Sequence, residues 1–129
     1  MRITILAVAP ILKGDLVTSA GAPATSPLDD IVGVAIEDYA IGEEATLETS
    51  GKVRVRVGAG GGGLTAGLAV VASAADADGS VEGVNPATVI LGLPLVGDSA
   101  FFAGVALETV AAGEEGYISF GVYTGSRQV

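Results

Sequence analysis

The chain has no histidine, no cysteine and no tryptophan among its 129 residues. Histidine is the commonest general base, the cysteine thiolate is a frequent nucleophile, and both are preferred zinc ligands. The serine and threonine hydroxyls therefore have no histidine to activate them. Because these absences exclude most enzyme classes, we expect a protein that is not an enzyme and uses no cofactor and no metal.

Basic residues are also scarce. Six Lys and Arg stand against fifteen Asp and Glu, which gives a formal net charge of −9. An acidic surface repels phosphate backbones and anionic lipids. The longest uncharged run, residues 57–75, contains six glycines and is a poor candidate for a membrane span. We therefore expect neither nucleic acid nor membrane among the partners.

The first residues deserve a separate interpretation. Arg2 and the apolar run as far as Leu12 are similar to the start of a signal peptide, but Lys13 and Asp15 fall where such a segment is uncharged. We expect the chain to be made in the cytoplasm and to remain unprocessed. The lack of cysteine does not indicate a redox compartment, because a chain of this length can build a core without disulfides.

Small and β-branched side chains dominate the apolar residues. Half of the chain is apolar, with 21 Ala and 25 Val and Ile against 11 Leu, and a further 20 positions are Gly. β-branched side chains favour strands. The chain is long enough for one hydrophobic core, so residues 1–129 are predicted to form a single β-rich domain.

A repeat divides the chain. Residues 31–44 read IVGVAIEDYAIGEE and residues 102–115 read FAGVALETVAAGEE, with eight of fourteen positions identical at an offset of 71. A weaker similarity precedes each copy, at residues 11–17 and 64–70. We infer an internal duplication with related halves at about 1–57 and 58–129.

Alternation of polar and apolar residues predicts strands along most of the chain. The predicted strands are 2–8, 15–19, 31–36, 45–49, 52–57, 68–72, 88–93, 104–107 and 117–124. Ser50-Gly51 is typical of a tight hairpin, and Asp76-Ala77-Asp78-Gly79 of a second turn. The pattern favours an antiparallel β-sandwich or a barrel-like domain. The alternative of a helix over residues 64–75, which are rich in alanine, stays open.

Two motifs admit a chemical interpretation, and a structural one is preferred for each. Residues 58–63 match the glycine pattern of a dinucleotide-binding loop, but the strand before them alternates Arg and Val, unlike a buried parallel strand, so a flexible loop is the better interpretation. Asp76, Asp78 and Glu82 offer oxygen ligands for Ca²⁺ but lack the remaining positions of an EF-hand, so a solvated turn is favoured. The pairs Glu43-Glu44 and Glu114-Glu115 are interpreted as solvated charges that flank turns.

Half of all positive charge lies on one face of one predicted strand, as Lys52, Arg54 and Arg56. Two interpretations stay open. The three side chains either bind an acidic partner surface or pair with acidic neighbours in their own sheet, for which Glu48 is the nearest candidate across Ser50-Gly51.

Residues 1–12 also admit two interpretations. They form either an extended arm that adds main-chain hydrogen bonds to a sheet edge of a partner, or the first strand of the domain's own sheet. The residues that would make the arm contact are Arg2, Ile3, Thr4, Ile5 and Leu6.

Large hydrophobic residues concentrate in one further segment. A thin sheet domain built from small residues does not need so many on one edge, so we predict that they lie between the subunits of a homo-oligomer. These candidate interface residues are Leu91, Leu93, Leu95, Phe101 and Phe102.

The doubled Gly-Val-Ala-x-Glu…Ala-x-Gly-Glu-Glu element and the turn and strand at Gly51-Lys52-Val53 resemble the small capsid decoration, or cement, proteins of tailed bacteriophages. The resemblance covers about two thirds of the chain. It implies a β-tulip-like domain, usually a homotrimer, that binds the outer surface of an expanded capsid at three-fold positions and stabilises the shell. The partners it implies are the major capsid protein and further copies of the chain, and the location is the outer surface of the virion.

A β-sandwich recognition module is the alternative function, either a head-fibre base or a carbohydrate-binding domain. Sugar-binding sites normally present exposed aromatic rings. The chain has only Tyr39, Tyr117, Tyr123 and three Phe. We therefore rank this alternative second.

Overall fold

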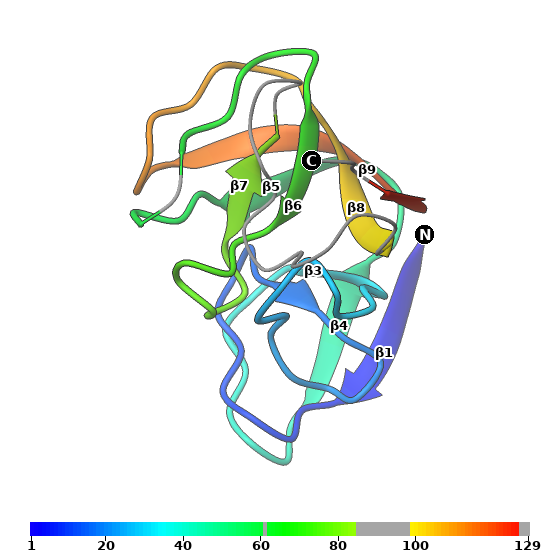
Figure 1. The fold of residues 1–129 in the computed structure, drawn as a ribbon. Coiled ribbons are helices and arrows are strands. Elements are labelled where there is room, and N and C mark those ends of the chain that lie inside the picture. Colours follow the sequence, from blue (N-terminus) through cyan, green and yellow to red (C-terminus); the bar gives the residue numbers. More distant parts are fainter. Residues whose placement is uncertain (61, 85–98, 127–129) are drawn as a thin grey trace.

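The computed structural model describes residues 1–60, 62–84 and 99–126, and every regular element among them is a strand. Two antiparallel sheets form the fold (Figure 1). The N-terminal sheet has the strand order β1-β4-β3-β2 and the C-terminal sheet has the order β5-β9-β8-β6-β7. Both sheets are open rather than closed into a barrel, so the prediction of an all-β, sandwich-like domain is confirmed.

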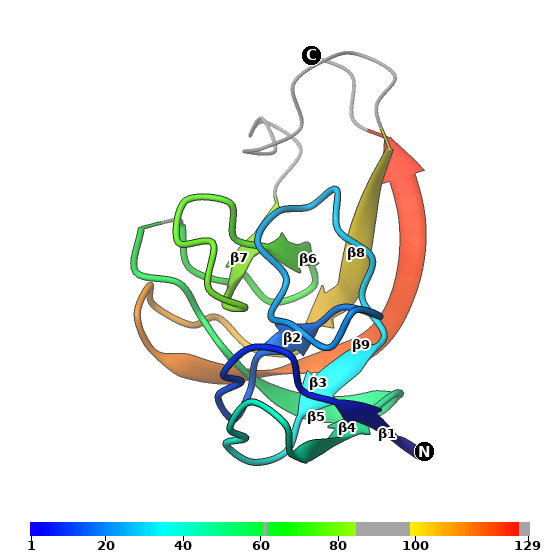
Figure 2. The same ribbon diagram turned by 90° about the horizontal axis from the view of Figure 1, so that it is seen from below.

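The strand boundaries follow the alternation in the sequence. The N-terminal sheet consists of β1 (Arg2–Leu6), β2 (Leu16–Val17), β3 (Gly33–Ala35) and β4 (Glu44–Glu48). The C-terminal sheet consists of β5 (Gly51–Arg56), β6 (Ala69–Ala72), β7 (Val81–Gly83), β8 (Ser99–Ala106) and β9 (Glu115–Ser126). Strand β9 is the longest and is strongly bent, as Figure 2 shows. The prediction of a strand at 88–93 lies outside the described residues.

Three details differ from the predictions. Residues 64–75 contain β6, so the alternative of a helix there is wrong. Ser50-Gly51 is not a hairpin turn, because β4 and β5 belong to different sheets. Strand β7 was not predicted, because three residues are too few to show alternation.

The repeat appears in the hydrogen bonds as well as in the sequence. Leu16 lies opposite Val34 in the N-terminal sheet, and the residues 53 and 71 positions further on, Ala69 and Val105, lie opposite each other in the C-terminal sheet. The N–H of Gly14 donates to the carbonyl of Ala35 at 2.9 Å, and the matching bond from residue 67 to residue 106 measures 2.8 Å. The two repeat segments therefore occupy equivalent positions.

Strand β1 corresponds to β5 in the same way, at an offset of 50. Leu6 pairs with Glu44 at the start of β4, and Arg56 pairs with Glu115 at the start of β9. The first repeat unit thus ends near residue 50, and the strand at 51–56 belongs to the second unit rather than to the first. We call residues 1–49 the N-terminal half and residues 50–129 the C-terminal half.

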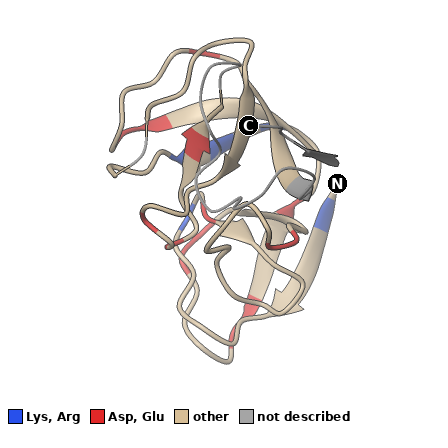
Figure 3. Cartoon of the chain, in the orientation of Figure 1, with Lys and Arg blue, Asp and Glu red and all other residues tan. Residues whose placement is uncertain are grey.

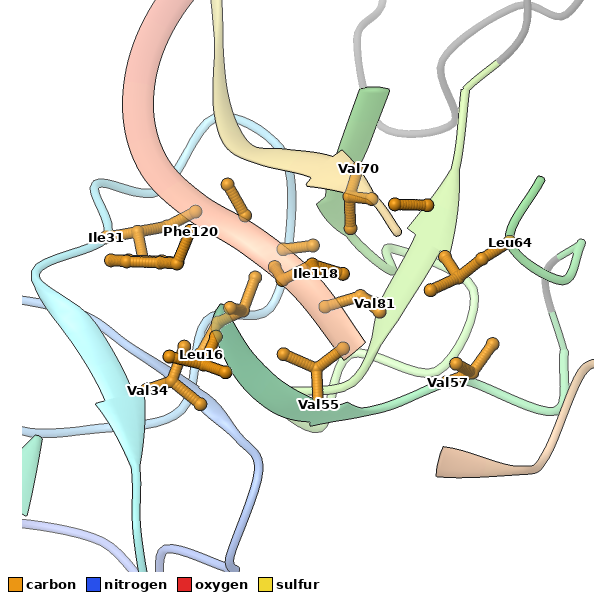
Figure 4. Packing of buried hydrophobic residues seen from close by; sticks show 14 of the residues in the cluster. Leu16, Ile31, Val34, Val55, Val57, Leu64, Val70, Val81, Ile118 and Phe120 are labelled. Atoms are coloured by element: carbon orange, nitrogen blue, oxygen red, sulfur yellow. The ribbon is translucent and has the colours of Figure 1, made fainter. Parts of the chain in front are cut away.

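Each sheet has an inner face that carries its own core and an outer face opposite to it. The inner core of the N-terminal half consists of Ala7, Ile11, Val17, Ala35, Ala45 and Leu47, with Ile5, Val32 and Tyr39 at its border. The larger core surrounds Val55, Val70 and Ile118 of the C-terminal half and also includes Leu16, Ala24, Ile31 and Val34 from the N-terminal half (Figure 4). The two halves therefore share the larger core, whereas the inner core of the N-terminal half contains residues of that half alone.

Candidate interaction surface

Strand β5 is an edge strand of the C-terminal sheet, and it carries the predicted basic residues (Figure 3). Val53 and Val55 point into the core, so Lys52, Arg54 and Arg56 share the outer face. The structure therefore brings these three predicted residues onto one face, as the alternation indicated. It does not give them the same surroundings.

Lys52 and Arg54 are exposed and lie around one aromatic ring. The ammonium nitrogen of Lys52 is 4.6 Å from the centroid of the Tyr117 ring, and the guanidinium carbon of Arg54 is 5.9 Å from it. Tyr117 lies opposite Arg54 on β9. Arg54 also forms an ion pair with Glu115 at 3.0 Å, in which both side chains are about half exposed. Such exposed contacts contribute little to stability, so both cations are accessible to a partner.

Arg56 has a different role, because it joins the two halves. Its guanidinium contacts the carboxylate of Asp15, which is 1 % exposed, and forms an ion pair with Asp78 at 3.2 Å. Its own backbone N–H donates to the carbonyl of Gly14 at 3.3 Å. Arg56 is therefore a structural cation. Of the three basic residues on β5, Lys52 and Arg54 are the ones that a partner can reach.

Burial dominates the ionisation of Asp15. It raises the pKa of this carboxyl above its usual range, although the N–H of Leu12, at 2.9 Å, and the guanidinium of Arg56 both act to lower it. Burial also acts to raise the pKa of Asp78, but hydrogen bonds from Ser80 and the charge of Arg56 outweigh it and leave that pKa lowered. One arginine thus serves two acids with opposite pKa shifts.

Glu48, the candidate partner of Lys52, Arg54 and Arg56, pairs with other groups instead. It accepts from the side chain of Arg2 at 3.0 Å and from the N-terminal ammonium at 3.3 Å, and these hydrogen bonds lower the pKa of its carboxyl. The interpretation in which Glu48 pairs with Lys52, Arg54 and Arg56 is wrong, because Ser50-Gly51 carries the chain from one sheet into the other. Among the described residues, the acidic side chains that pair with β5 are those of Asp15, Asp78 and Glu115.

Residues 2–6 form a strand of the domain's own sheet. Strand β1 pairs with β4 from Arg2 to Leu6, and Ala7, which follows it, is buried in the inner core. The second of the two interpretations of residues 1–12 is therefore the one observed. Strand β1 is nevertheless an edge strand, and Ile3 and Leu6 remain exposed on it.

The predicted subunit-interface residues fall into two groups. Leu91, Leu93 and Leu95 lie outside the described residues. Phe101 packs against the large core, and Phe102 is buried in a small cluster with Val71. The two phenylalanines therefore pack within the chain and do not form an exposed patch.

The glycine loop and the turn with Asp76 form one unit. The N–H of Gly60 donates to the two carboxylate oxygens of Asp76 at 3.0 and 3.2 Å, and the Ser73 hydroxyl donates to the same carboxylate at 2.8 Å. The carboxylate of Asp76 thus holds the backbone of the glycine loop by hydrogen bonds. Burial, and then the charge of Asp76, raises the pKa of Glu82. Across the described residues no three acidic side chains gather closely enough to hold a metal ion.

A solved structure shares this fold over almost the entire length of both chains. The chain is similar to the head fiber gp8.5 N base of bacteriophage phi29, with a TM-score of 0.62, 17 % sequence identity, and coverage of 94 % of this chain and 93 % of that one. No family model and no curated protein matches the sequence. In the described part of the chain, no helix has the length and apolarity of a membrane span.

Proposed function

We propose that this chain is a non-enzymatic structural protein of a bacteriophage virion that attaches to the outer surface of the capsid. The observation that carries the proposal is the similarity to a phage head fiber base over nearly the full length of both chains. The resemblance of the doubled Gly-Val-Ala-x-Glu element to capsid decoration proteins supports the same location.

The proposed contact with the major capsid protein is the outer face of β5. Lys52 and Arg54 are exposed there around Tyr117, in a chain whose net charge is −9. A cationic patch on an acidic protein selects an acidic surface and fixes the orientation of docking. Arg56 supports this patch from within the fold rather than contacting the partner.

Within this location, the proposed activity is that of a decoration protein that stabilises the expanded shell, as a homotrimer at three-fold positions. The second candidate is a head-fibre base, which anchors a fibre and leaves the shell's own stability unchanged. The fold similarity favours this second candidate specifically. A carbohydrate-binding role has less support, because Tyr117 is in contact with two cations and the Tyr39 hydroxyl donates to a backbone carbonyl.

Co-sedimentation with capsid shells tests the proposal. Purified chain is mixed with expanded shells and with unexpanded shells assembled from the major capsid protein of the same phage. We expect binding to expanded shells that weakens as added salt screens Lys52 and Arg54. A decoration protein also delays the heat-induced disruption of those shells, whereas a fibre base does not. Failure to pellet with either shell would contradict both candidates.

A further inference from the structure

The duplication makes it possible to compare each position of one half with its counterpart in the other. The inner core of the N-terminal half has counterparts that also point inward in the C-terminal half. Ile11, Val17 and Leu47 correspond to Leu64, Val70 and Ile118, and all six are buried. The two inner cores are therefore built in the same way.

Within the part of the chain that the structure describes, the other half contributes side chains to only one of these cores. Four side chains of the N-terminal half complete the core of the C-terminal half, and they are Leu16, Ala24, Ile31 and Val34. Leu16 and Val34 lie on the outer face of the N-terminal sheet, because their neighbours in β2 and β3 point to the inner core. Figure 4 shows both in the same cluster as Val55 of β5. The outer face of one half thus covers the inner face of the next.

Among residues 1–60, 62–84 and 99–126, no corresponding cover lies over the N-terminal half. Ile3 of β1 is 37 % exposed, whereas its counterpart Val53 is 6 % exposed. Ile5 is only partly buried, whereas its counterpart Val55 is fully buried. A face that is closed in the second half therefore remains open in the first.

The outer face of the C-terminal sheet, which corresponds to the covering face of the N-terminal sheet, is likewise exposed. The residues that match Leu16 and Val34 are Ala69, which is half-buried, and Val105, which is 37 % exposed. Leu107 extends this exposed apolar face beyond β8. The described part of the chain therefore has one exposed inner face, at Ile3 and Ile5, and one exposed outer face, at Ala69 and Val105.

We propose that these two surfaces bind each other between copies of the chain, in a head-to-tail contact that repeats the contact between the halves. The outer face at Ala69 and Val105 of one copy covers Ile3 and Ile5 of the next. This proposal concerns self-association in solution and does not depend on attachment to a capsid.

The main chain favours the same contact. Between the halves, the N–H of Arg56 donates to the carbonyl of Gly14. The counterparts are Leu6, on the edge strand β1, and Gly67, around which a side-chain atom would meet nothing within 4 Å. The backbone of Gly67 is therefore free to approach β1 of another copy at the N–H of Leu6, whereas the carbonyl of Leu6 already lies against Gly21 of its own chain.

Charge also favours the contact between copies. The charged residues that line the groove between the halves are Lys13, Glu48, Lys52 and Arg54. At the offsets of 53, 71 and 50, their counterparts are Ala66, Ser119, Arg2 and Thr4. Three of the four charges are thus replaced by uncharged residues, which lowers the cost of removing water from the interface.

A head-to-tail contact joins two different surfaces, so it generates either a closed ring or an open chain. A ring of three copies uses every such surface and meets the three-fold symmetry proposed above. Lys52 and Arg54 lie on the edge strand β5, which β9 separates from Val105 on β8.

Sedimentation of variants tests this interface. Ile3→Lys removes one surface and Val105→Lys removes the other, and each is expected to weaken self-association by at least about tenfold. Val122→Lys is the matched control, because Val122 is similarly exposed on β9 but points to the opposite face from Tyr117. Because each single variant keeps one intact surface, an equimolar mixture of Ile3→Lys and Val105→Lys is expected to form a complex that stops at two chains. Far-UV circular dichroism checks that all variants are folded.

Cysteine cross-linking is a second readout, since the natural chain has no cysteine. Thr4→Cys and Ala66→Cys are expected to form a disulfide when the two variants are mixed, and neither is expected to cross-link with itself. Three results would overturn the proposal. They are a wild-type chain that stays monomeric up to its solubility limit, unchanged association of Ile3→Lys and Val105→Lys, and cross-linking of Thr4→Cys with itself, which indicates a two-fold interface.

Discussion

The guanidinium of Arg56 on β5 contacts the carboxylate of Asp15, a residue of the other half that is almost completely buried. This is the ionic contact across the shared core, and Asp78 completes it from the turn between β6 and β7. A buried carboxylate without its cation is costly, so the position of β5 against the N-terminal half depends on this pair.

We predict that Arg56→Met destabilises the fold by about 3 kcal/mol near pH 7, because it leaves Asp15 buried without a counter-charge. The loss is expected to be smaller near pH 4. Since the pKa of Asp15 is raised in the folded chain, its contribution to stability is largest below the ordinary aspartate pKa of about 4 and declines as pH rises through the raised value. Removal of Arg56 raises that pKa further. Urea unfolding at both pH values measures the difference.

Arg54→Met is the control for this experiment. Its ion pair with Glu115 is exposed on both sides, so we expect a change of no more than about 0.5 kcal/mol at either pH. An equal loss in Arg54→Met and Arg56→Met would show that the two cations have the same role, which contradicts the account.

We predict that deletion of residues 1–9 unfolds the protein or leaves it aggregated. The deletion removes all of β1 and the buried Ala7, and it exposes the edge of β4. Circular dichroism and thermal melting of the truncated chain measure this. A truncated chain that is soluble and melts like the full chain would show that β1 acts as a detachable arm. Arg2→Ala, which loses only exposed contacts with Glu48, is expected to melt within a few degrees of wild type.

We predict that Leu16→Ala lowers the free energy of unfolding by about 2 to 5 kcal/mol. Leu16 is in the N-terminal sheet, but its side chain belongs to the core of the C-terminal half. A single cooperative transition is therefore expected to shift as a whole. Ile41→Ala, at an exposed site outside the proposed interface between copies, is the control and is expected to change stability by no more than about 0.5 kcal/mol. Two separate transitions in Leu16→Ala would contradict the shared core.

We predict that Gly104→Ala is far more damaging than Gly42→Ala. Gly104 lies at an irregularity between β8 and β9 with φ of +145°, and a side-chain atom there would stand 2.0 Å from the carbonyl oxygen of Ser119. Gly42 also has a positive φ, of +89°, but nothing lies within 4 Å of that position. We expect about 1 kcal/mol for Gly42→Ala, from backbone strain alone, and several times as much for Gly104→Ala. Thermal unfolding of both variants measures this, and equal effects would mean that the close approach of the two strands is not needed.

Most of the fold was predictable from the sequence because its signals are local. Alternation placed the strands, and the offset of 71 placed the two repeat segments in equivalent positions. The partition between sheets was not predictable in the same way. Ser50-Gly51 has the composition of a hairpin turn, and only the pairing of β5 with β9 shows that it connects two sheets.

The candidate surface was predictable in part. Alternation placed Lys52, Arg54 and Arg56 on one face, but their partners are distant in the sequence, and Asp15 is 41 residues from Arg56. No local pattern indicates a contact over that separation. The offset of 50 between β1 and β5 is a signal in the sequence that β5 begins the second repeat unit. It aligns Arg2 with Lys52 and Ile3 with Val53.

Electron cryo-microscopy of expanded shells incubated with the purified chain tests the central claim most directly. The account predicts additional density on the outer surface of the shell at three-fold positions, into which three copies of the fold fit with Lys52 and Arg54 facing the capsid. It also predicts that Lys52→Glu combined with Arg54→Glu removes this density while the variant stays folded. Shells whose outer surface shows no additional density after incubation with excess wild-type chain would contradict the claim that this is a capsid-binding protein.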